Sequence, residues 1–341
     1  MADPEEHVIP LSEIPIRRQA RLSIAIIGNP NSGKSTLFNR LTGLRQTTGN
    51  YPGVTVERHV GTVQLDHSAI HLVDLPGIYC LGGHSADEKI AVDVLLGRID
   101  PRDKPSALLV VIDVTHLYQG LFLLEQILEL QLPTMVALTM HDLAAAKGLD
   151  IDTDALSKRL GGIKVIPVSA RTGSGLVSLR QAMERLPHEA VPALPSSWPE
   201  LSETAQRLAN KSDPQLTRIE VLQGLIHPGS QAELSLTKAL SPEMVNEERA
   251  RLFGDDPPQA VEARHRYTSI RSMLDETQSE AKLLTRMSSR TTNAVNKPWP
   301  ATLLFFVVLA LVFQAVFSWA TPIMDAIDAA ASGLGNMVNA R

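Results

Sequence analysis

Residues 28–35 read GNPNSGKS and stand between an apolar stretch, residues 22–27, and a helix-like segment, residues 36–41. A strand, a glycine-rich turn and a helix N-terminus in this order direct backbone N–H groups at a polyphosphate, while the lysine lies against the outer phosphates. An ordinary glycine-rich turn is the alternative, but chance rarely places one between such a strand and such a helix. We therefore predict a nucleoside triphosphate site here, with Ser35 offering a hydroxyl to Mg²⁺. The predicted nucleotide-binding residues of this loop are Gly28, Asn29, Asn31, Ser32, Gly33, Lys34, Ser35 and Thr36.

Length and composition place this loop in a larger protein. The chain has 341 residues, which is too long for one domain of about 150 residues. Its net charge of −5 disfavours a nucleic-acid partner, which would need a basic surface. A single cysteine, Cys80, excludes an internal disulfide framework and a cysteine-built zinc site. The acidic N-terminus, MADPEE, lacks a signal-peptide pattern, so we expect the first domains in the cytoplasm.

The distribution of apolar runs, helix formers and turn residues divides the chain into four predicted segments before the apolar stretch near its C-terminus. Residues 21–190 alternate β-rich apolar runs with helical segments, which is typical of a doubly wound α/β domain with a parallel sheet. Residues 191–200 are rich in proline and serine and indicate a linker, and residues 1–20 form an N-terminal extension. From 201 to 297 helix formers with apolar spacing predict a small all-α domain. The expected strands are 22–27, 69–73, 107–112, 134–138 and 164–168.

Residues 301–320, ATLLFFVVLALVFQAVFSWA, contain no charged residue. About 20 apolar residues span a bilayer core, and tryptophans at both edges, Trp299 and Trp319, suit its interfaces. We predict one transmembrane helix at 298–322 in the inner (cytoplasmic) membrane, the alternative being a buried core helix. Basic residues precede the span and acidic residues follow it, so the positive-inside rule makes residues 323–341 an extracytoplasmic tail.

Two further segments complete the predicted phosphate site. Asp74 follows the apolar run 70–73, so its carboxylate comes at a strand end, where it can hold Mg²⁺ through water while the Gly77 N–H reaches the γ-phosphate. Between this motif and the phosphate loop, residues 49–57 read GNYPGVTVE, and Thr55 offers a hydroxyl that can ligate Mg²⁺. The alternative for this segment is a plain surface loop. Lys34, Thr55 and Gly77 are the predicted catalytic residues.

Taken together, these segments resemble one family. GNPNSGKSTLFN at 28–39, GNYPGVTVE at 49–57, DLPGIY at 74–79, VIDVTHLYQGLFLLEQILEL at 111–130 and VSAR at 168–171 resemble the cytoplasmic region of the bacterial ferrous iron transporter FeoB. EARHRYTSI at 262–270 resembles the end of that family's helical spacer domain, and 301–320 its first transmembrane helix. The resemblance implies a P-loop GTPase that uses GTP, GDP, Mg²⁺ and K⁺.

The resemblance also implies how hydrolysis is assisted. In this family the GTPase is activated by K⁺, and Asn31 matches the asparagine that ligates this ion. A monovalent cation at the phosphates supplies the positive charge that an arginine finger supplies elsewhere. The residue after Gly77 is Ile78, which cannot orient water as the glutamine of Ras-like enzymes does. We therefore expect slow, K⁺-stimulated GTP hydrolysis.

The base-reading segment departs from the usual pattern. Guanine is normally read by Asn-Lys-x-Asp, whereas residues 139–142 read TMHD. Asp142 keeps the carboxylate that accepts two N–H bonds from guanine, for which adenine has no matching donor pair. Thr139 is too short to reproduce both amide contacts, which leaves guanine selectivity open. Ser169, Ala170 and Arg171 are expected to support the base, through the Ala170 N–H.

Two functions remain open at this point. The first is the GTP-hydrolysing part of a ferrous iron transporter, which couples nucleotide state through the helical domain to the membrane. The second is a membrane-anchored GTP-binding switch that regulates a partner without moving a solute. One span contains no pore, so the first function requires a multispan permease, in the same protein or as a separate chain. Besides guanine nucleotide and the lipid bilayer, a homo-oligomer is a partner that the sequence leaves open.

Overall fold

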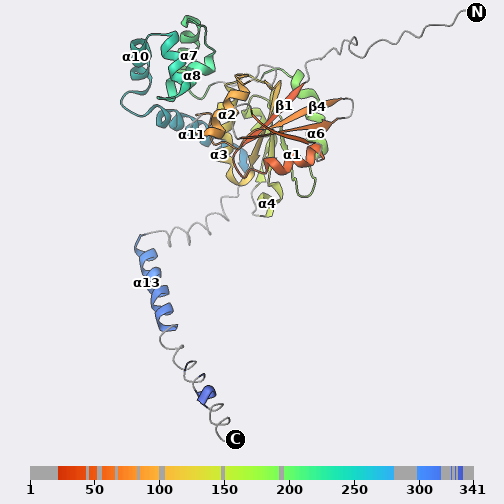
Figure 1. Ribbon diagram of the computed structural model, residues 1–341, viewed down its shortest axis with the longest axis vertical. Helices are drawn as coiled ribbons and strands as arrows, with labels where there is room; N and C mark the ends of the chain where they lie inside the picture. Colours follow the sequence, from red (N-terminus) through yellow and green to blue (C-terminus); the bar gives the residue numbers. More distant parts are fainter. Residues whose placement is uncertain are drawn as a thin grey trace, which may run out of the picture. The chain divides into compact units, whose positions relative to one another are not determined.

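The computed structural model describes residues 22–43, 46–51, 56–65, 68–82, 85–99, 104–146, 150–191, 196–279, 298–315, 324, 327 and 329–332. Residues 1–20 and the candidate Mg²⁺ ligand Thr55 lie outside these ranges. The chain divides into two compact units, Met1–Ser279 and Glu280–Arg341. The first unit contains the sheet, its covering helices and the helical region (Figure 1).

The first unit is built on a seven-stranded sheet with the order β2-β3-β4-β1-β5-β6-β8. All five strands expected from the sequence are present, as β1, β4, β5, β6 and β8. Parallel pairing of β1 with β4 and β5 sets Ile26 opposite Asp74 and Gly28 opposite Val111. The carboxyl ends of these strands therefore meet at one edge, where a doubly wound sheet binds its ligands. The bounds are β1 (Ser23–Gly28), β2 (Gln46–Asn50), β3 (Glu57–Gln64), β4 (Ala69–Asp74), β5 (Ala107–Asp113), β6 (Thr134–Thr139) and β8 (Val165–Pro167).

The parallel sheet predicted from the sequence is antiparallel at one side. Strand β3 runs antiparallel to β4, and β2 runs antiparallel to β3, so the sheet is mixed. A short connection joins β3 to β4 and reverses the chain direction, as antiparallel neighbours allow. The sequence of β3, ERHVGTVQ, has little apolar content and is mostly half-buried. Strand β3, which lies between β2 and β4, therefore lacked the apolar signal that identified the central strands.

Helices cover both faces of the sheet, as a doubly wound fold requires. Along β1, Ile24 and Ile26 belong to one buried cluster, whereas Ala25 and Ile27 belong to the cluster on the opposite face. Helices α1 (Lys34–Thr42) and α6 (Leu176–Arg185) cover the first face. The opposite face is covered by α2 (Ala86–Leu95), α3 (Leu117–Leu128) and α5 (Thr153–Arg159).

In the predicted all-α region, every helix or strand that the structure describes from α7 to α11 is a helix. Side-chain caps begin several of its helices; for example, Thr217 and Glu220 form a capping box at α8, an arrangement that satisfies N–H groups at the helix start. Its core is apolar and includes Trp198, Leu222 and Phe253. The helices are α7 (Pro199–Lys211), α8 (Arg218–Ile226), α9 (Gln231–Ala239), α10 (Pro242–Phe253) and α11 (Pro258–Thr277).

Helix α11 belongs to two cores. Val261, near its start, lies in the core of the helical region, whereas Ile270 and Leu274 lie in the core that α3 and α5 form on the sheet. Directly after α11, β9 (Gln278–Ser279) pairs antiparallel with β7 (Asp150–Ile151). The boundary at residue 200 predicted from the sequence therefore separates two regions that share one long helix.

The second unit contains α13 (Pro298–Gln314), in which the described apolar side chains are exposed, for example Leu303 and Phe305. Within the described ranges, no helix combines the length and the apolar character needed to cross a membrane. Residues 316–322 of the predicted span lie outside those ranges. The transmembrane helix predicted at 298–322 is therefore not seen in the structure.

Candidate nucleotide site

The phosphate loop joins β1 to α1 in a conformation suited to anions. Asn31 and Gly33 both have positive φ, 64° and 84°, and Gly33 caps the N-terminus of α1. Backbone N–H groups in such turns converge on a concave anion site, and the helix dipole adds to the attraction. The Ser32 hydroxyl is buried and has no hydrogen-bond partner among the described residues. A Cβ on Gly28 would lie 2.3 Å from the Val111 carbonyl oxygen, so only glycine fits there.

The central charge pair of the site joins the phosphate loop to β4. Lys34 Nζ lies 2.9 Å from Asp74 Oδ1, and both residues are 8% exposed. The sequence predicted Lys34 for the outer phosphates and Asp74 for Mg²⁺, and the structure brings the two groups together. Ser35 and Thr36 lie exposed in the first turn of α1. An ammonium, a carboxylate and a hydroxyl thus lie close to one helix N-terminus, the chemistry that a Mg²⁺–polyphosphate requires.

The segment after β4 is fixed against the phosphate loop by backbone contacts. The Ile78 N–H donates to the Gly28 carbonyl at 3.2 Å, and Asn29 Nδ2 donates to the Ile78 carbonyl at 3.1 Å. A Cβ on Gly77 would lie 3.0 Å from the Pro30 Cα. Gly77 therefore lies directly against the phosphate loop, and its predicted contact with a γ-phosphate stays a prediction.

Ile78 does not extend into the site. Its side chain is 1% exposed and packs in the core under α2 and α3, whereas Tyr79, the next residue, is 54% exposed. The side chain that follows Gly77 therefore contributes packing, and it has no group that could orient a water molecule.

Thr139 at the end of β6 makes contacts that the sequence analysis missed. Its hydroxyl lies 2.6 Å from the Ser32 carbonyl oxygen and 3.2 Å from that of Ile112. Thr139 is buried, so this hydroxyl ties the candidate base-reading segment, residues 139–142, to the phosphate loop. The signal available in the sequence was the hydroxyl itself, in the position where an asparagine is usual.

Asp142 lies in the short helix α4 (His141–Ala146) and is paired with Arg171. The Nε and Nη2 atoms of Arg171 both donate to Asp142 Oδ2, at 3.0 and 2.8 Å. Hydrogen bonding to this guanidinium holds the pKa of the Asp142 carboxyl below its usual range, so the group is ionised at neutral pH. Ser169 and Ala170 precede Arg171 in a turn in which the Gly173 N–H donates to the Ser169 carbonyl at 2.8 Å.

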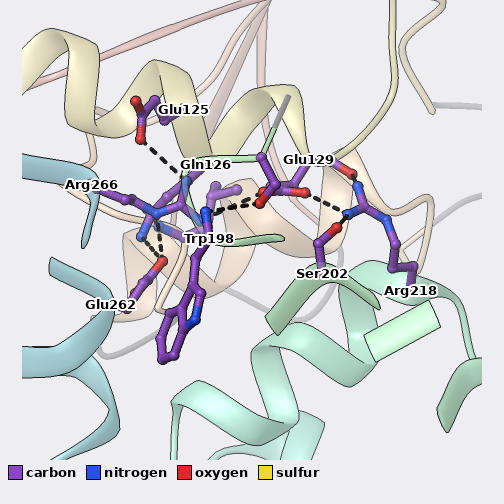
Figure 2. A network of polar contacts seen from close by, with 10 residues as sticks. Glu125, Gln126, Glu129, Trp198, Ser202, Arg218, Glu262 and Arg266 are labelled. Atoms are coloured by element: carbon purple, nitrogen blue, oxygen red, sulfur yellow. Dashed lines mark hydrogen bonds and ion pairs between the residues drawn. The ribbon is translucent and has the colours of Figure 1, made fainter. Parts of the chain in front are cut away.

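A buried polar network leads from the DLPG segment to the helical region, and Figure 2 shows its central part. The Leu81 N–H donates to Gln126 Oε1 at 2.8 Å, and Gln126 Nε2 donates to Glu262 Oε1 of α11 at 3.2 Å. Arg266 Nε in turn lies 2.7 Å from Glu262 Oε1. The sequence analysis quoted the stretches 111–130 and 262–270 for the family resemblance but did not single out these residues, because a polar side chain in a helix does not show which distant segment it contacts.

The same network borders a cavity of about 360 Å³ between the α/β region and the helical region. Arg218 of α8 crosses this boundary, with Nη1 2.7 Å from Oε2 of Glu129, the residue directly after α3, and 2.7 Å from the Ser202 hydroxyl (Figure 2). Arg266 lies 3.7 Å from Glu125 and 3.9 Å from Glu129. Charged contacts, in addition to the apolar face of α11, therefore join the two regions.

Comparison with known proteins identifies the family. Residues 22–183 match the family described as Ferrous iron transport protein B. The fold matches the cytosolic domain of T. maritima FeoB in a GDP form, with a TM-score of 0.66 and 30% identity over 76% of this chain and 98% of that one. The chain belongs to the FeoB family. The GMPPNP form of the same T. maritima domain has a TM-score of 0.65 and 29% identity, over 76% of this chain and all of that one.

The matches extend beyond the α/β region, so the chain comprises the FeoB N-terminal cytosolic GTPase domain and its helical region. The Fe(2+) transporter FeoB of Leptospira biflexa is 31% identical over 333 residues, which are 92% of this chain and 46% of that protein. The Fe(2+) transporter FeoB of Escherichia coli K12 is 39% identical over 293 residues, 81% of this chain and 35% of that protein. The chain thus spans less than half the length of these FeoB relatives.

Proposed function

We propose that this FeoB region binds GTP and GDP at the phosphate loop and hydrolyses GTP as the nucleotide-dependent part of a ferrous iron transporter. The observation that carries the proposal is the Lys34–Asp74 pair at the N-terminus of α1, with Gly77 against the same loop. Two further facts support it: the related T. maritima domain has GDP and GMPPNP forms, and the full-length relatives are named Fe(2+) transporters.

The residues present fit a Mg²⁺–GTP complex. Ser35 and Asp74 would hold Mg²⁺, with Thr55 as a third ligand, and bound Mg²⁺ would neutralise charge that develops on the phosphates. Lys34 would leave Asp74 for the outer phosphates, and the Gly77 N–H would donate to the γ-phosphate. The orphaned Ser32 hydroxyl and the positive-φ turn support this assignment, because a phosphate would supply the missing acceptor.

Asn31, exposed in the same turn, is the proposed ligand of an activating K⁺. Since Ile78 packs in the core, no side chain directly after Gly77 can orient the attacking water. Backbone groups and a cation at the phosphates would have to stabilise the transition state instead. From this arrangement we expect slow GTP hydrolysis that is accelerated by K⁺ but not by Na⁺.

The test is binding and turnover by the full chain with GTP and with ATP, each in K⁺ and in Na⁺. Tight GTP binding, weaker ATP binding and K⁺-dependent hydrolysis are expected. ATP turnover that equals GTP turnover would remove the guanine assignment, and equal rates in the two salts would remove the K⁺ site.

The chain spans 46% and 35% of two relatives that are named Fe(2+) transporters, and iron translocation would require a permease in addition to a nucleotide site. We propose the multispan portion of a longer FeoB protein, or a separate permease chain, as the partner, with the bilayer reached through residues 298–322. Copurification with a soluble partner and no multispan partner would favour the regulatory switch instead.

Nucleotide state can reach the helical region through the buried network. Leu81 follows the DLPG segment closely, and Gln126 links its N–H to Glu262 of α11. Movement of this segment toward a γ-phosphate would therefore strain or break a buried hydrogen bond to the helical region, which costs about 1–3 kcal/mol. We propose this route as the coupling between the two regions.

Exchange of GDP for a non-hydrolysable GTP analogue should change hydrogen exchange both at 49–57 and in the helical region 201–277. Thr55→Ala should abolish both changes while GDP binding stays nearly intact, because Thr55 acts only when the γ-phosphate and Mg²⁺ are present. Gln126→Leu should keep the change at 49–57 and lose the change in the helical region.

Gln119→Leu, an exposed position in the same helix, is the matched control and should behave as the wild type. Changes restricted to the α/β region in the wild-type protein would make the helical region a passive spacer. A full response by Gln126→Leu would show that coupling takes another route.

A further inference from the structure

The guanidinium of Arg171 resembles the edge of guanine in the groups it offers to Asp142. Two neighbouring N–H groups, on Nε and Nη2, donate to the carboxylate at 3.0 and 2.8 Å. Guanine likewise offers two neighbouring N–H groups, on N1 and on the exocyclic N2, to the aspartate that reads it. Both Arg171 N–H groups donate to Oδ2, so a guanine that needs both carboxylate oxygens would have to share this one with the guanidinium.

We infer that Arg171 is an affinity-determining residue that competes with guanine for Asp142 and must be displaced when the base binds. This inference rests on the proposed function, since it assigns Asp142 to the guanine base. Arg171 would then lower affinity for every guanine nucleotide by stabilising the protein without the base. This role is opposite to that expected from the sequence, where Arg171 was assigned to support the bound base.

The backbone around Arg171 is fixed, whereas its side chain is free to leave. Arg40 Nη2 of α1 donates to the Arg171 carbonyl at 3.2 Å, and the Thr172 N–H donates to Ser169 Oγ at 3.3 Å. The Arg171 side chain is 79% exposed, while that of Asp142 is 23% exposed. The arginine can therefore swing into solvent without any change in the turn that carries it.

Competition at Asp142 matters because Thr139, the other candidate base-reading residue, cannot make the usual amide contacts with guanine. Thr139 has its hydroxyl committed to the Ser32 and Ile112 carbonyls, and it has no amide to offer the base. Selective hydrogen bonding to guanine thus depends mainly on Asp142. A residue that occupies this carboxylate then affects a large share of the base-specific binding energy.

The expected effect is modest because the pair is exposed. Ion pairs between exposed side chains contribute little free energy and are screened by salt. The Arg171-paired state of the protein lowers the apparent affinity for nucleotide only to the extent that this state is populated. We therefore expect Arg171→Ala to bind GDP and GTP about 2–5-fold more tightly than the wild type, by equal factors. The gain should shrink in 1 M salt, where the Debye length falls to about 3 Å.

The test is a double-mutant cycle on the full chain, with GDP dissociation constants from titration calorimetry for the wild type, Arg171→Ala, Asp142→Asn and the double variant. In the Asp142→Asn background Arg171→Ala should change GDP affinity little, because the charge that it pairs with is gone. Arg185→Ala removes the same charge from an exposed position at the last turn of α6 and should bind GDP as the wild type does.

Weaker GDP binding by Arg171→Ala would overturn the inference, because it would show that Arg171 contacts the nucleotide favourably. Unchanged binding, or the same gain in both backgrounds, would overturn it as well. These outcomes leave the proposed function intact as long as the wild type binds GDP. If the wild type and every variant fail to bind GDP, the proposed function and this inference fall together.

Discussion

Lys34→Ala is expected to abolish binding of GTP and GDP, with a loss in affinity of about 100-fold or more. Lys34 is the cationic side chain of the phosphate loop, and its Nζ lies 2.9 Å from Asp74 Oδ1. A bound polyphosphate would draw this ammonium away from Asp74 and accept more than one charge-assisted hydrogen bond from it. Each such bond contributes about 1.5–3 kcal/mol. Titration calorimetry of the full chain with each nucleotide measures the loss.

The same substitution leaves Asp74 unpaired at 8% exposure, and breaking a buried ion pair costs about 3–5 kcal/mol of stability. Urea unfolding of each variant therefore has to accompany the binding measurement. Lys34→Gln keeps an N–H donor for Asp74 without the charge and should still lose nucleotide binding. Lys89→Ala, exposed on α2, is the matched control. Near-wild-type affinity in a folded Lys34→Ala protein would reject the site.

Much of this site could be predicted because it is local in sequence. The spacing of Gly28, Gly33 and Lys34 fixes a turn between one strand and one helix, and the structure shows that turn with its left-handed Gly33. The position of Asp74 at the end of β4 followed from the short apolar run before it, which is typical of a strand. Short-range steric rules determine both features, so they can be read without knowledge of the rest of the chain.

The features that the sequence did not reveal depend on contacts between distant segments. Gln126 and Glu262 are 136 positions apart, and nothing in either segment specifies the other. The sequence pattern of α11 shows one apolar face, which is why the helix was assigned to the helical region. The pattern does not show that the two halves of this face enter different cores. Strand β3, between β2 and β4, was missed because many of its side chains are half-buried or exposed, so tertiary packing decided its state more than composition did.

Thr139 and Arg171 illustrate a third limit. Both positions were identified as parts of the base site, but their contacts could not be derived from residue type. A threonine hydroxyl can bind a base, a backbone carbonyl or water, and only the register of β6 beside β5 places it against Ser32 and Ile112. An arginine at the surface has similar freedom, and the fold places it within reach of Asp142.

Asp142→Asn should weaken GTP binding by about 100-fold, since two hydrogen bonds to a charged acceptor are each worth roughly a factor of ten or more. An asparagine can accept one guanine N–H, but its own amide N–H₂ then faces the second donor of the base. ATP affinity should not change, because adenine has no donor pair for this carboxylate. Parallel calorimetric titrations with GTP and ATP measure both values. Equal affinity of the wild type for the two nucleotides would show that Asp142 does not read the base.

The loss of GTP affinity caused by Asp142→Asn should be larger in a protein that lacks the Arg171 side chain than in the wild type. In the wild type the substitution removes both the guanine contact and the competing Arg171 contact, so part of the loss is offset. In an Arg171→Ala protein no competitor is present, and Asp142→Asn should weaken GTP binding by a factor about 2–5-fold larger than in the wild type. A smaller cost in that background would mean that Asp142 and Arg171 bind the base together, with the arginine acting as a support for guanine.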